Sequence, residues 1–168
     1  MSTLCEEETF SQVFNTYATT LYNFLYYKSG DQELSRDLMQ EAFMKLWQNC
    51  AEVALDTAKG YVFMIAKNKL LNQFEHQKVK LKFKAQANTN KIDKEDPEYL
   101  LRVKEYKLSL EMAISELPEK QRVVFLMSRV DKKTYKEIAQ LLGISKQAVE
   151  KRIYSALNTL RRIDFKIK

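Results

Sequence analysis

The side chains best suited to recognising a ligand lie in one stretch near the C-terminus, between Thr134 and Ile153 and just beyond it. Cations, amides, a carboxylate and a hydroxyl follow one another there at helical spacing: Lys146, Gln147, Glu150, Lys151, Arg152 and Ser155. Cations neutralise phosphates, and amide or carboxylate groups hydrogen-bond to base edges in the major groove of DNA. This pattern favours nucleic-acid recognition over catalysis.

The residues around these side chains predict a helix-turn-helix, the element that places one helix in a DNA groove. Ala139 is small and lets two helices cross closely, and Gly143 suits the left-handed conformation that the turn demands. Ser145 is placed to cap the next helix. The shared core would come from Ile138, Leu142, Ile144, Val149 and Ile153. The alternative is an ordinary helical hairpin whose polar face is only solvated.

Charge is distributed unevenly along the chain, whose formal net charge is +6. Residues 1–60 hold 4 basic and 9 acidic side chains, whereas residues 61–91 hold 7 and 1, and residues 131–168 hold 10 and 4. Either basic block alone is equally well explained as a solvated face. Two such blocks at the ends of two helical units favour nucleic acid, and the acidic first third is free to meet a protein.

The composition gives no sign of an enzyme, a metal site or a membrane anchor. His76 is the only histidine, and the 3 glycines are too isolated to form a phosphate-binding loop. We therefore expect no catalytic site, no metal and no cofactor. The longest apolar run is far too short to cross a membrane, and no signal peptide is visible. We expect a cytoplasmic protein in which Cys5 and Cys50 are two free thiols.

The elements that must position these groups are helices throughout. Apolar residues recur at spacings of three and four, which predicts helices over residues 7–28, 31–50, 56–83, 98–116, 119–130, 135–142 and 146–163. Residues 85–97 carry almost no large apolar side chains and are typical of a flexible linker. The expected fold class is all-α, with a helical domain over 7–84, a linker over 85–97 and a helix-turn-helix domain over 98–165.

Several runs resemble one family of transcription proteins. The run from Asp37 to Trp47 resembles the second conserved region of bacterial sigma factors, and Gly60 to Asn72 looks like the promoter-melting part of that region. The segment from Leu117 to Arg122 and the helix-turn-helix are similar to the fourth region. Because only a short linker separates these regions, the resemblance is to the extracytoplasmic-function (ECF) group, over about residues 8–163.

The resemblance implies a factor that binds core RNA polymerase and directs it to promoters. The predicted second helix would grip a coiled coil of the largest polymerase subunit, through Asp37, Gln40, Glu41, Phe43 and Trp47. A wide apolar arc on this helix agrees with such a role. A plain core position is the alternative for Phe43 and Trp47, because large aromatic side chains are most often buried.

The resemblance also implies that the predicted third helix melts the −10 element and captures an unstacked base. Binding favours the single strand when cations hold its backbone and a pocket holds the flipped base. The candidates are Tyr61, Lys67, Asn68, Lys69, Asn72 and His76. Glu75 departs from the family, in which many relatives carry a basic residue, and a carboxylate there would repel phosphate.

The helix-turn-helix would read the duplex −35 element. By position, Glu150, Lys151 and Ser155 are the expected base readers, and Glu150 suits a cytosine amino group. The expected phosphate contacts are Lys146, Gln147 and Arg152. An anti-sigma protein is a further implied partner, and no small-molecule substrate is expected.

Two other classes of protein remain as rivals. A helix-turn-helix regulator without a sigma role, such as a dimerising repressor, would bind palindromic duplex in the absence of polymerase. A helical protein–protein adaptor with incidental basic faces would show no salt-sensitive DNA binding.

Overall fold

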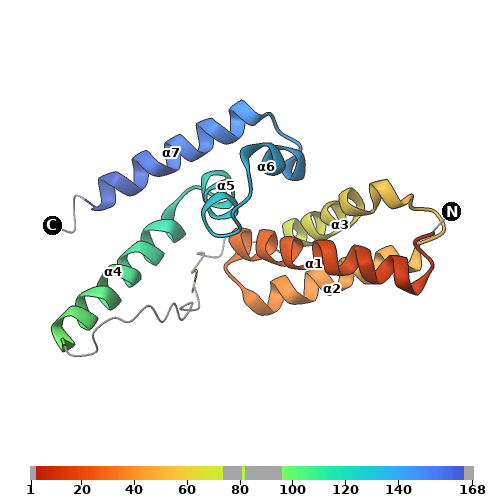
Figure 1. Ribbon diagram of the computed structural model, residues 1–168, viewed down its shortest axis with the longest axis horizontal. Coiled ribbons are helices and arrows are strands. Elements are labelled where there is room, and N and C mark those ends of the chain that lie inside the picture. The colour runs from red at the N-terminus through yellow and green to blue at the C-terminus, as the bar shows by residue number, and fades with distance from the viewer. Residues whose placement is uncertain (1–2, 74–80, 82–95, 165–168) are drawn as a thin grey trace.

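The computed structural model describes residues 3–73, 81 and 96–164, and every regular element within them is a helix (Figure 1). The elements are α1 (Glu7–Ser29), α2 (Gln32–Gln48), the short 3₁₀ helix η1 (Leu55–Thr57), α3 (Ala58–Gln73), α4 (Pro97–Glu116), α5 (Glu119–Arg129), α6 (Tyr135–Leu142) and α7 (Lys146–Asp164). This confirms the all-α fold class. The first unit comprises α1 to α3, and the second unit comprises α4 to α7.

The first unit is a three-helix bundle, because each helix carries one apolar stripe. The inward residues are fully or almost fully buried: Leu21 and Leu25 on α1, Leu38, Ala42 and Leu46 on α2, and Val62, Ala66 and Leu70 on α3. Gly30 ends α1 in the left-handed conformation (φ 71°), and Asp31 caps α2 by accepting a 2.9 Å hydrogen bond from the backbone N–H of Leu34. These two helix ends agree with the boundary predicted between residues 28 and 31.

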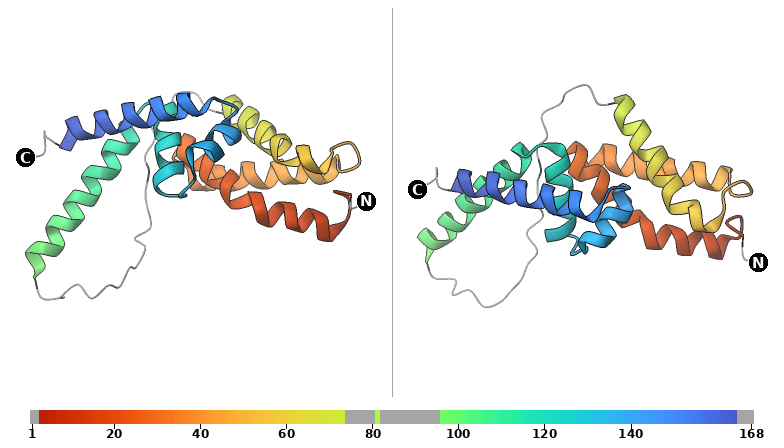
Figure 2. Two further views of the ribbon diagram at one scale, coloured as in Figure 1. Left: turned by 45° about the horizontal axis from the view of Figure 1, so that its top comes forward. Right: turned by 90° about the horizontal axis from the view of Figure 1, so that it is seen from above.

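The second unit is built around the predicted helix-turn-helix. Val124 and Met127 of α5, Ile138 of α6, and Val149, Ile153 and Ala156 of α7 form its buried centre. Helix α4 leads away from this centre, as both views of Figure 2 show. Its buried residues are Ala113 and Ile114, close to its C-terminal end.

The segment that joins the two units lies mostly outside the described residues. Helix α3 is described as far as Gln73, so the expected continuation to residue 83 falls in the part not described. The predicted linker over 85–97 and the domain limits at 84 and 98 likewise stay predictions. Leu81 is buried, and its backbone N–H donates a 3.1 Å hydrogen bond to Ser115 Oγ near the C-terminal end of α4.

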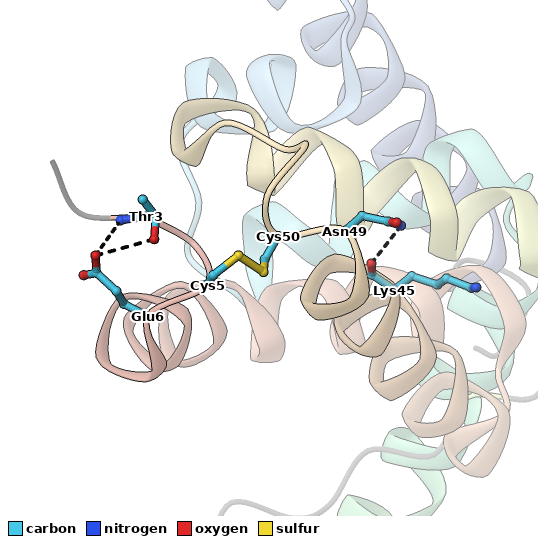
Figure 3. Close-up of a disulfide and its surroundings, with 6 residues drawn as sticks. All are labelled: Thr3, Cys5, Glu6, Lys45, Asn49 and Cys50. Carbon is cyan, nitrogen blue, oxygen red and sulfur yellow. Dashed lines mark hydrogen bonds between the residues drawn. A yellow bond between two sulfur atoms is a disulfide. The ribbon is translucent and has the colours of Figure 1, made fainter.

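The cysteines correct one expectation. Cys5 and Cys50 are not free thiols but form a disulfide, with Cα atoms 5.1 Å apart across 45 residues of sequence (Figure 3). Because α1 and α2 are antiparallel neighbours, the start of α1 lies beside the end of α2. The prediction of free thiols was wrong because it rested on an expected reducing compartment and took no account of this helical hairpin.

Candidate nucleic-acid interface

Helix α7 is held at a defined angle by its turn. Gly143 has φ 65°, the left-handed conformation expected of it. Ser145 Oγ accepts a 3.1 Å hydrogen bond from the backbone N–H of Ala148 and so caps α7. At the start of α6, Thr134 and Glu137 form a capping box. These local interactions fix the conformation of the turn, and the turn sets the direction of α7 relative to α6.

The six predicted duplex-binding side chains lie outside the buried core of α7. Lys146, Gln147, Glu150 and Lys151 are exposed, while Arg152 and Ser155 are half-buried. Lys146 and Glu150 form an exposed ion pair of 3.5 Å one turn apart. Such a pair contributes little to stability, so both groups are available to exchange it for a nucleic-acid contact.

A groove joins α7 to the start of α5, and it contains residues that the sequence analysis missed. It is lined by Pro118, Glu119, Lys120, Gln121, Ala148, Lys151, Arg152 and Ser155. Helix α5 has no side-chain cap at its N-terminus, so its first backbone N–H groups give this end of the groove a positive partial charge. Lys120 adds a full charge there, and Pro118 is the sequence signal that could have placed it, because proline cannot lie inside a helix and α5 begins directly after it.

Some of the predicted single-strand contacts on α3 are exposed side chains, and others already bind another residue of the protein. Lys67, Asn68 and Asn72 are exposed. The ammonium of Lys69 forms an ion pair with the carboxylate of Glu41 on α2. The Tyr61 hydroxyl accepts a 2.7 Å hydrogen bond from Asn49 Nδ2. His76, like the divergent Glu75, lies outside the described residues.

A second groove runs along α1 and α2 and contains most of the predicted polymerase-binding set. It has a volume of about 440 Å³ and is lined by Phe10, Phe14, Gln40, Phe43, Met44, Trp47 and Gln48. Phe43 is buried and packs edge-on against Phe10 and Phe14. Trp47 is 44% exposed and packs edge-on against Phe10, with ring centroids 4.9 Å apart. Phe43 is therefore the floor of the groove and Trp47 part of its rim.

The polar members of that set lie on α2 beside the aromatic rings. Asp37 and Gln40 are exposed, and Glu41 is half-buried against Lys69. This acidic and amide edge beside an aromatic groove is the composition of a protein-binding surface, with a hydrophobic centre and a polar rim. The ion pair between Glu41 and Lys69 links this surface to the candidate single-strand face on α3.

The two units meet where α1 packs on α5, a contact that sequence reasoning did not foresee. Arg122 is buried and donates hydrogen bonds to the backbone carbonyls of Tyr27 (2.8 Å) and Lys28 (3.2 Å) in the last turn of α1. Burial lowers the pKa of its guanidinium. The Lys28 ammonium lies 2.6 Å from the Glu119 carboxylate. A cation at a helix C-terminus is stabilising, so Arg122 holds the units together.

Asp131 is the second anchor of this contact. One of its carboxylate oxygens accepts hydrogen bonds from the Tyr27 hydroxyl (2.6 Å) and from Asn23 Nδ2 (3.0 Å), both on α1. Burial raises the pKa of Asp131, although the hydrogen bonds from Tyr27 and Asn23 oppose this effect. Burial and the neighbouring Asp131 also raise the pKa of Tyr27.

The part of the chain that the structure describes offers neither a metal site nor a membrane-spanning helix. It contains no group of three or more His, Cys, Asp or Glu side chains placed to hold a metal ion. None of its helices is long and apolar enough to span a membrane. The residues brought together are instead cations, amides and aromatic rings on the surfaces of α7, α3 and α2.

Comparison with known proteins identifies the same two units. The family description "Sigma-70 region 2" matches residues 13–79, and "Sigma-70, region 4" matches residues 107–160. The ECF RNA polymerase sigma factor SigM of Bacillus subtilis is 22% identical over 157 residues, covering 92% of this chain and 94% of SigM. SigW of the same species is 23% identical over 167 residues, covering 94% of this chain and 89% of SigW.

A solved structure has the same fold. The sigma factor RpoE of Bartonella quintana, in complex with the anti-sigma factor NepR, superposes with a TM-score of 0.60 at 18% identity. The superposition covers 92% of this chain and 95% of that chain. It supports the all-helical, two-unit architecture.

Proposed function

The chain belongs to the ECF group of the bacterial sigma-70 family, and we propose how its two units divide the work of promoter-specific initiation. The factor binds core RNA polymerase and directs transcription initiation at promoters. The first unit holds polymerase with α2 and the −10 strand with α3. The second unit reads the −35 duplex with α7. The observation that carries this proposal is the order of a region 2 match over 13–79 and a region 4 match over 107–160.

On α2, the groove floored by Phe43 and rimmed by Trp47 is our proposed polymerase contact. The exposed Asp37 and Gln40 beside it give charge and hydrogen-bonding specificity. Tryptophan is enriched among the few residues that carry most of the binding energy in protein interfaces. Trp47 is therefore the expected hot spot, and Phe43 supports it through Phe10, on which both rings pack.

On α3, the proposed −10 contacts are the exposed Lys67, Asn68 and Asn72. Lys69 joins them once its ion pair with Glu41 is exchanged for a phosphate, and Tyr61 braces the helix through Asn49. Melting requires no fuel nucleotide if these groups bind the single strand more tightly than the duplex. His76 stays a candidate from the sequence alone.

On α7, the proposal assigns base reading to Glu150, Lys151 and Ser155, and phosphate contacts to Lys146, Gln147 and Arg152. Lys120 is added as a phosphate contact, because it lines the same groove as Lys151 and Arg152. Phosphate contacts fix the register of a protein on DNA, whereas base contacts select its sequence.

The proposal extends to where and with what the factor works. We place it in the cytoplasm, where core polymerase and promoter DNA are found, and we assign it no catalytic activity of its own. An anti-sigma protein is its proposed inhibitor, in keeping with the partner of the Bartonella quintana sigma factor. Such a protein would cover the α2 groove and the α7 face.

Two matched lysine substitutions test the assignments on the second unit. Lys151→Ala is expected to change the preferred −35 sequence, while Lys120→Ala should leave it unchanged. Lys120→Ala should weaken binding to all sequences alike and lower the salt slope by about 1, because one phosphate contact is lost. Selecting promoters out of a randomised pool with the holoenzyme of each variant gives the −35 preference. Titrating promoter DNA with each holoenzyme at several salt concentrations gives the affinity and its salt slope. An unchanged −35 preference for Lys151→Ala would overturn the assignment of that residue.

A further inference from the structure

We propose that Cys5 and Cys50 form a reversible redox site, and that its oxidised state increases the affinity of the first unit for core polymerase. This inference rests on the proposed function of the α2 groove. It concerns a disulfide that the promoter-binding role does not require.

The disulfide closes the open end of a helical hairpin. Helices α1 and α2 are joined at one end by Gly30 and Asp31. At the other end Cys5, just before α1 begins, is bonded to Cys50, just after α2 ends (Figure 3). With the bond formed, both ends of the hairpin are tied covalently. With the bond broken, only packing holds the second end.

Of residues 3–6, only Leu4 is buried, so the short segment before α1 has few contacts of its own besides the disulfide. Leu4 is buried in the core, but Cys5 and Glu6 beside it are exposed. The turn that carries Leu4 is held by a 3.1 Å hydrogen bond from the Glu6 N–H to the Thr3 carbonyl. The Glu6 carboxylate also accepts hydrogen bonds from the Thr3 backbone N–H (3.2 Å) and hydroxyl (3.5 Å). Breaking the disulfide removes the covalent link that keeps Leu4 in place.

The tied end is also the aromatic end of the polymerase groove. The backbone N–H of Cys50 donates to the Trp47 carbonyl at 3.2 Å, so the bond is one turn from the groove rim. Phe10, the ring that packs on Trp47, lies at the same end of α1. Asn49, next to Cys50, holds the Tyr61 hydroxyl on α3. The disulfide therefore fixes the spacing between the two walls of the groove.

The proposed cytoplasmic setting of the factor points away from a permanent structural bond between these residues. Disulfides in a reducing cytoplasm are uncommon, and those that occur usually act as transient or redox-sensing bonds. The chain has 2 cysteines, and these two are paired with each other. A pair of this kind responds to the redox state without needing a third thiol.

The chemistry balances with two common reagents. A peroxide oxidises one thiolate to a sulfenic acid and leaves as water, and the second thiol then displaces a second water to form the disulfide. Two electrons pass from the thiols to the peroxide. In the reverse direction, a dithiol reductant attacks Cys5 Sγ, because Cys5 is exposed and Cys50 is half-buried. Cys50 leaves as a thiolate, and the second thiol of the reductant resolves the mixed disulfide.

The expected effect is preorganisation. A groove whose walls are already fixed loses less conformational freedom when it binds a partner, and so binds more tightly. Oxidation should therefore lower the Kd for core polymerase about 3- to 10-fold, without adding any contact. Peroxide stress would increase the share of polymerase that carries this factor.

The experiment compares one protein in two redox states. The purified full chain is oxidised with hydrogen peroxide, freed of peroxide, and divided, and one half is reduced with dithiothreitol and desalted. Both halves are titrated with core polymerase in reductant-free buffer. A maleimide count before titration should give no free thiol in the oxidised protein and two in the reduced one. The double variant C5S/C50S, carried through the same treatments, controls for methionine oxidation.

The inference is supported if oxidised wild type binds several-fold tighter than reduced wild type, while the double variant matches the reduced protein after either treatment. Equal affinities of the two wild-type states would overturn it, as would two free thiols after peroxide. If no sample binds polymerase at all, the proposed function of the groove fails instead.

A measurement without polymerase keeps the two failures apart. Trp47 is the only tryptophan of the chain, so its fluorescence reports on the groove alone. Reduction should shift its emission and lower the thermal midpoint of wild type by roughly 5–15 °C, and should change neither in C5S/C50S. Identical spectra and midpoints for the two wild-type states would overturn the redox site, whatever the polymerase result.

Discussion

At the scale of single residues, the contact between the units depends on a buried charge, that of Arg122, and on a half-buried one, that of Asp131. Arg122 satisfies four backbone carbonyls, those of Tyr27, Lys28, Ser115 and Leu117. Asp131 satisfies two donors from α1. A buried charge contributes only when its partners are complete, and losing it leaves those partners unpaired.

Arg122→Leu should therefore be strongly destabilising. The substitution keeps apolar bulk but removes the donor for four carbonyls, so we expect the free energy of unfolding to fall by about 3–5 kcal/mol. Urea denaturation followed by circular dichroism measures it. Arg129→Leu is the control, because Arg129 is exposed on the same helix, and it should change stability by less than about 0.5 kcal/mol. Equal losses in the two variants would contradict the role given to Arg122.

The raised pKa of Asp131 predicts that the stability of the fold depends on pH. Burial raises its pKa above the ordinary value of 3.8, so the folded chain binds this proton more tightly than the unfolded chain. Its contribution to stability is thus fully present below that ordinary value and is lost as the pH rises through the folded-state pKa. Asp131→Asn removes this dependence while keeping an acceptor for Tyr27 and Asn23.

The test is the difference in unfolding free energy between wild type and Asp131→Asn, followed from acidic to neutral pH. Wild type should lose unfolding free energy relative to Asp131→Asn as the pH rises above about 4, and the difference should then become constant. A difference that is constant from the start would mean that Asp131 has an ordinary pKa.

At the scale of elements, the local signals in the sequence were sufficient for most of the fold. Gly143 and Ser145 marked helix ends that the structure confirms, and Gly30 and Asp31 stand at the boundary predicted between residues 28 and 31. Capping and left-handed turns depend on residues within a few positions of one another, so a single sequence contains them. The exposed face of α7 followed from the same local periodicity.

The same substitution, glycine to alanine, tests this local account at one glycine in a turn and one glycine in a helix. Gly143 has φ 65°, so Gly143→Ala should cost about 1 kcal/mol or more, because side chains disfavour that conformation. Gly60 lies within α3 with open space where a Cβ would be. Gly60→Ala should therefore raise stability by about 0.5–1 kcal/mol. Thermal denaturation of both variants measures this, and two changes of the same sign would contradict it.

The parts of the site that the sequence did not reveal depend on contacts between elements. The ion pair of Lys69 with Glu41 joins α3 to α2, and Lys120 meets the recognition helix only because α5 begins beside α7. The disulfide is the clearest case, since it needs α1 and α2 to run antiparallel for their whole length. Periodicity defines the buried face of a helix but not the neighbour that covers it.

At the scale of the whole molecule, the packing of α1 on α5 brings the units into one body. In this arrangement both the polar face of α7 and the α2 groove remain accessible to solvent, as the exposure of Lys151 and Trp47 shows. The sequence offered no route to this arrangement, because Asp131 and Arg122 reach α1 across about a hundred residues. The family assignment does not depend on it.

The central claim is that this chain directs polymerase to promoters, and one measurement tests it most directly. Purified protein is added to bacterial core RNA polymerase, and transcripts are sequenced from a library of random promoter templates. We expect transcripts that require the protein and that share a paired −35 and −10 sequence. An absence of such transcripts, with the protein alone binding a palindromic duplex, would contradict the account and favour a repressor.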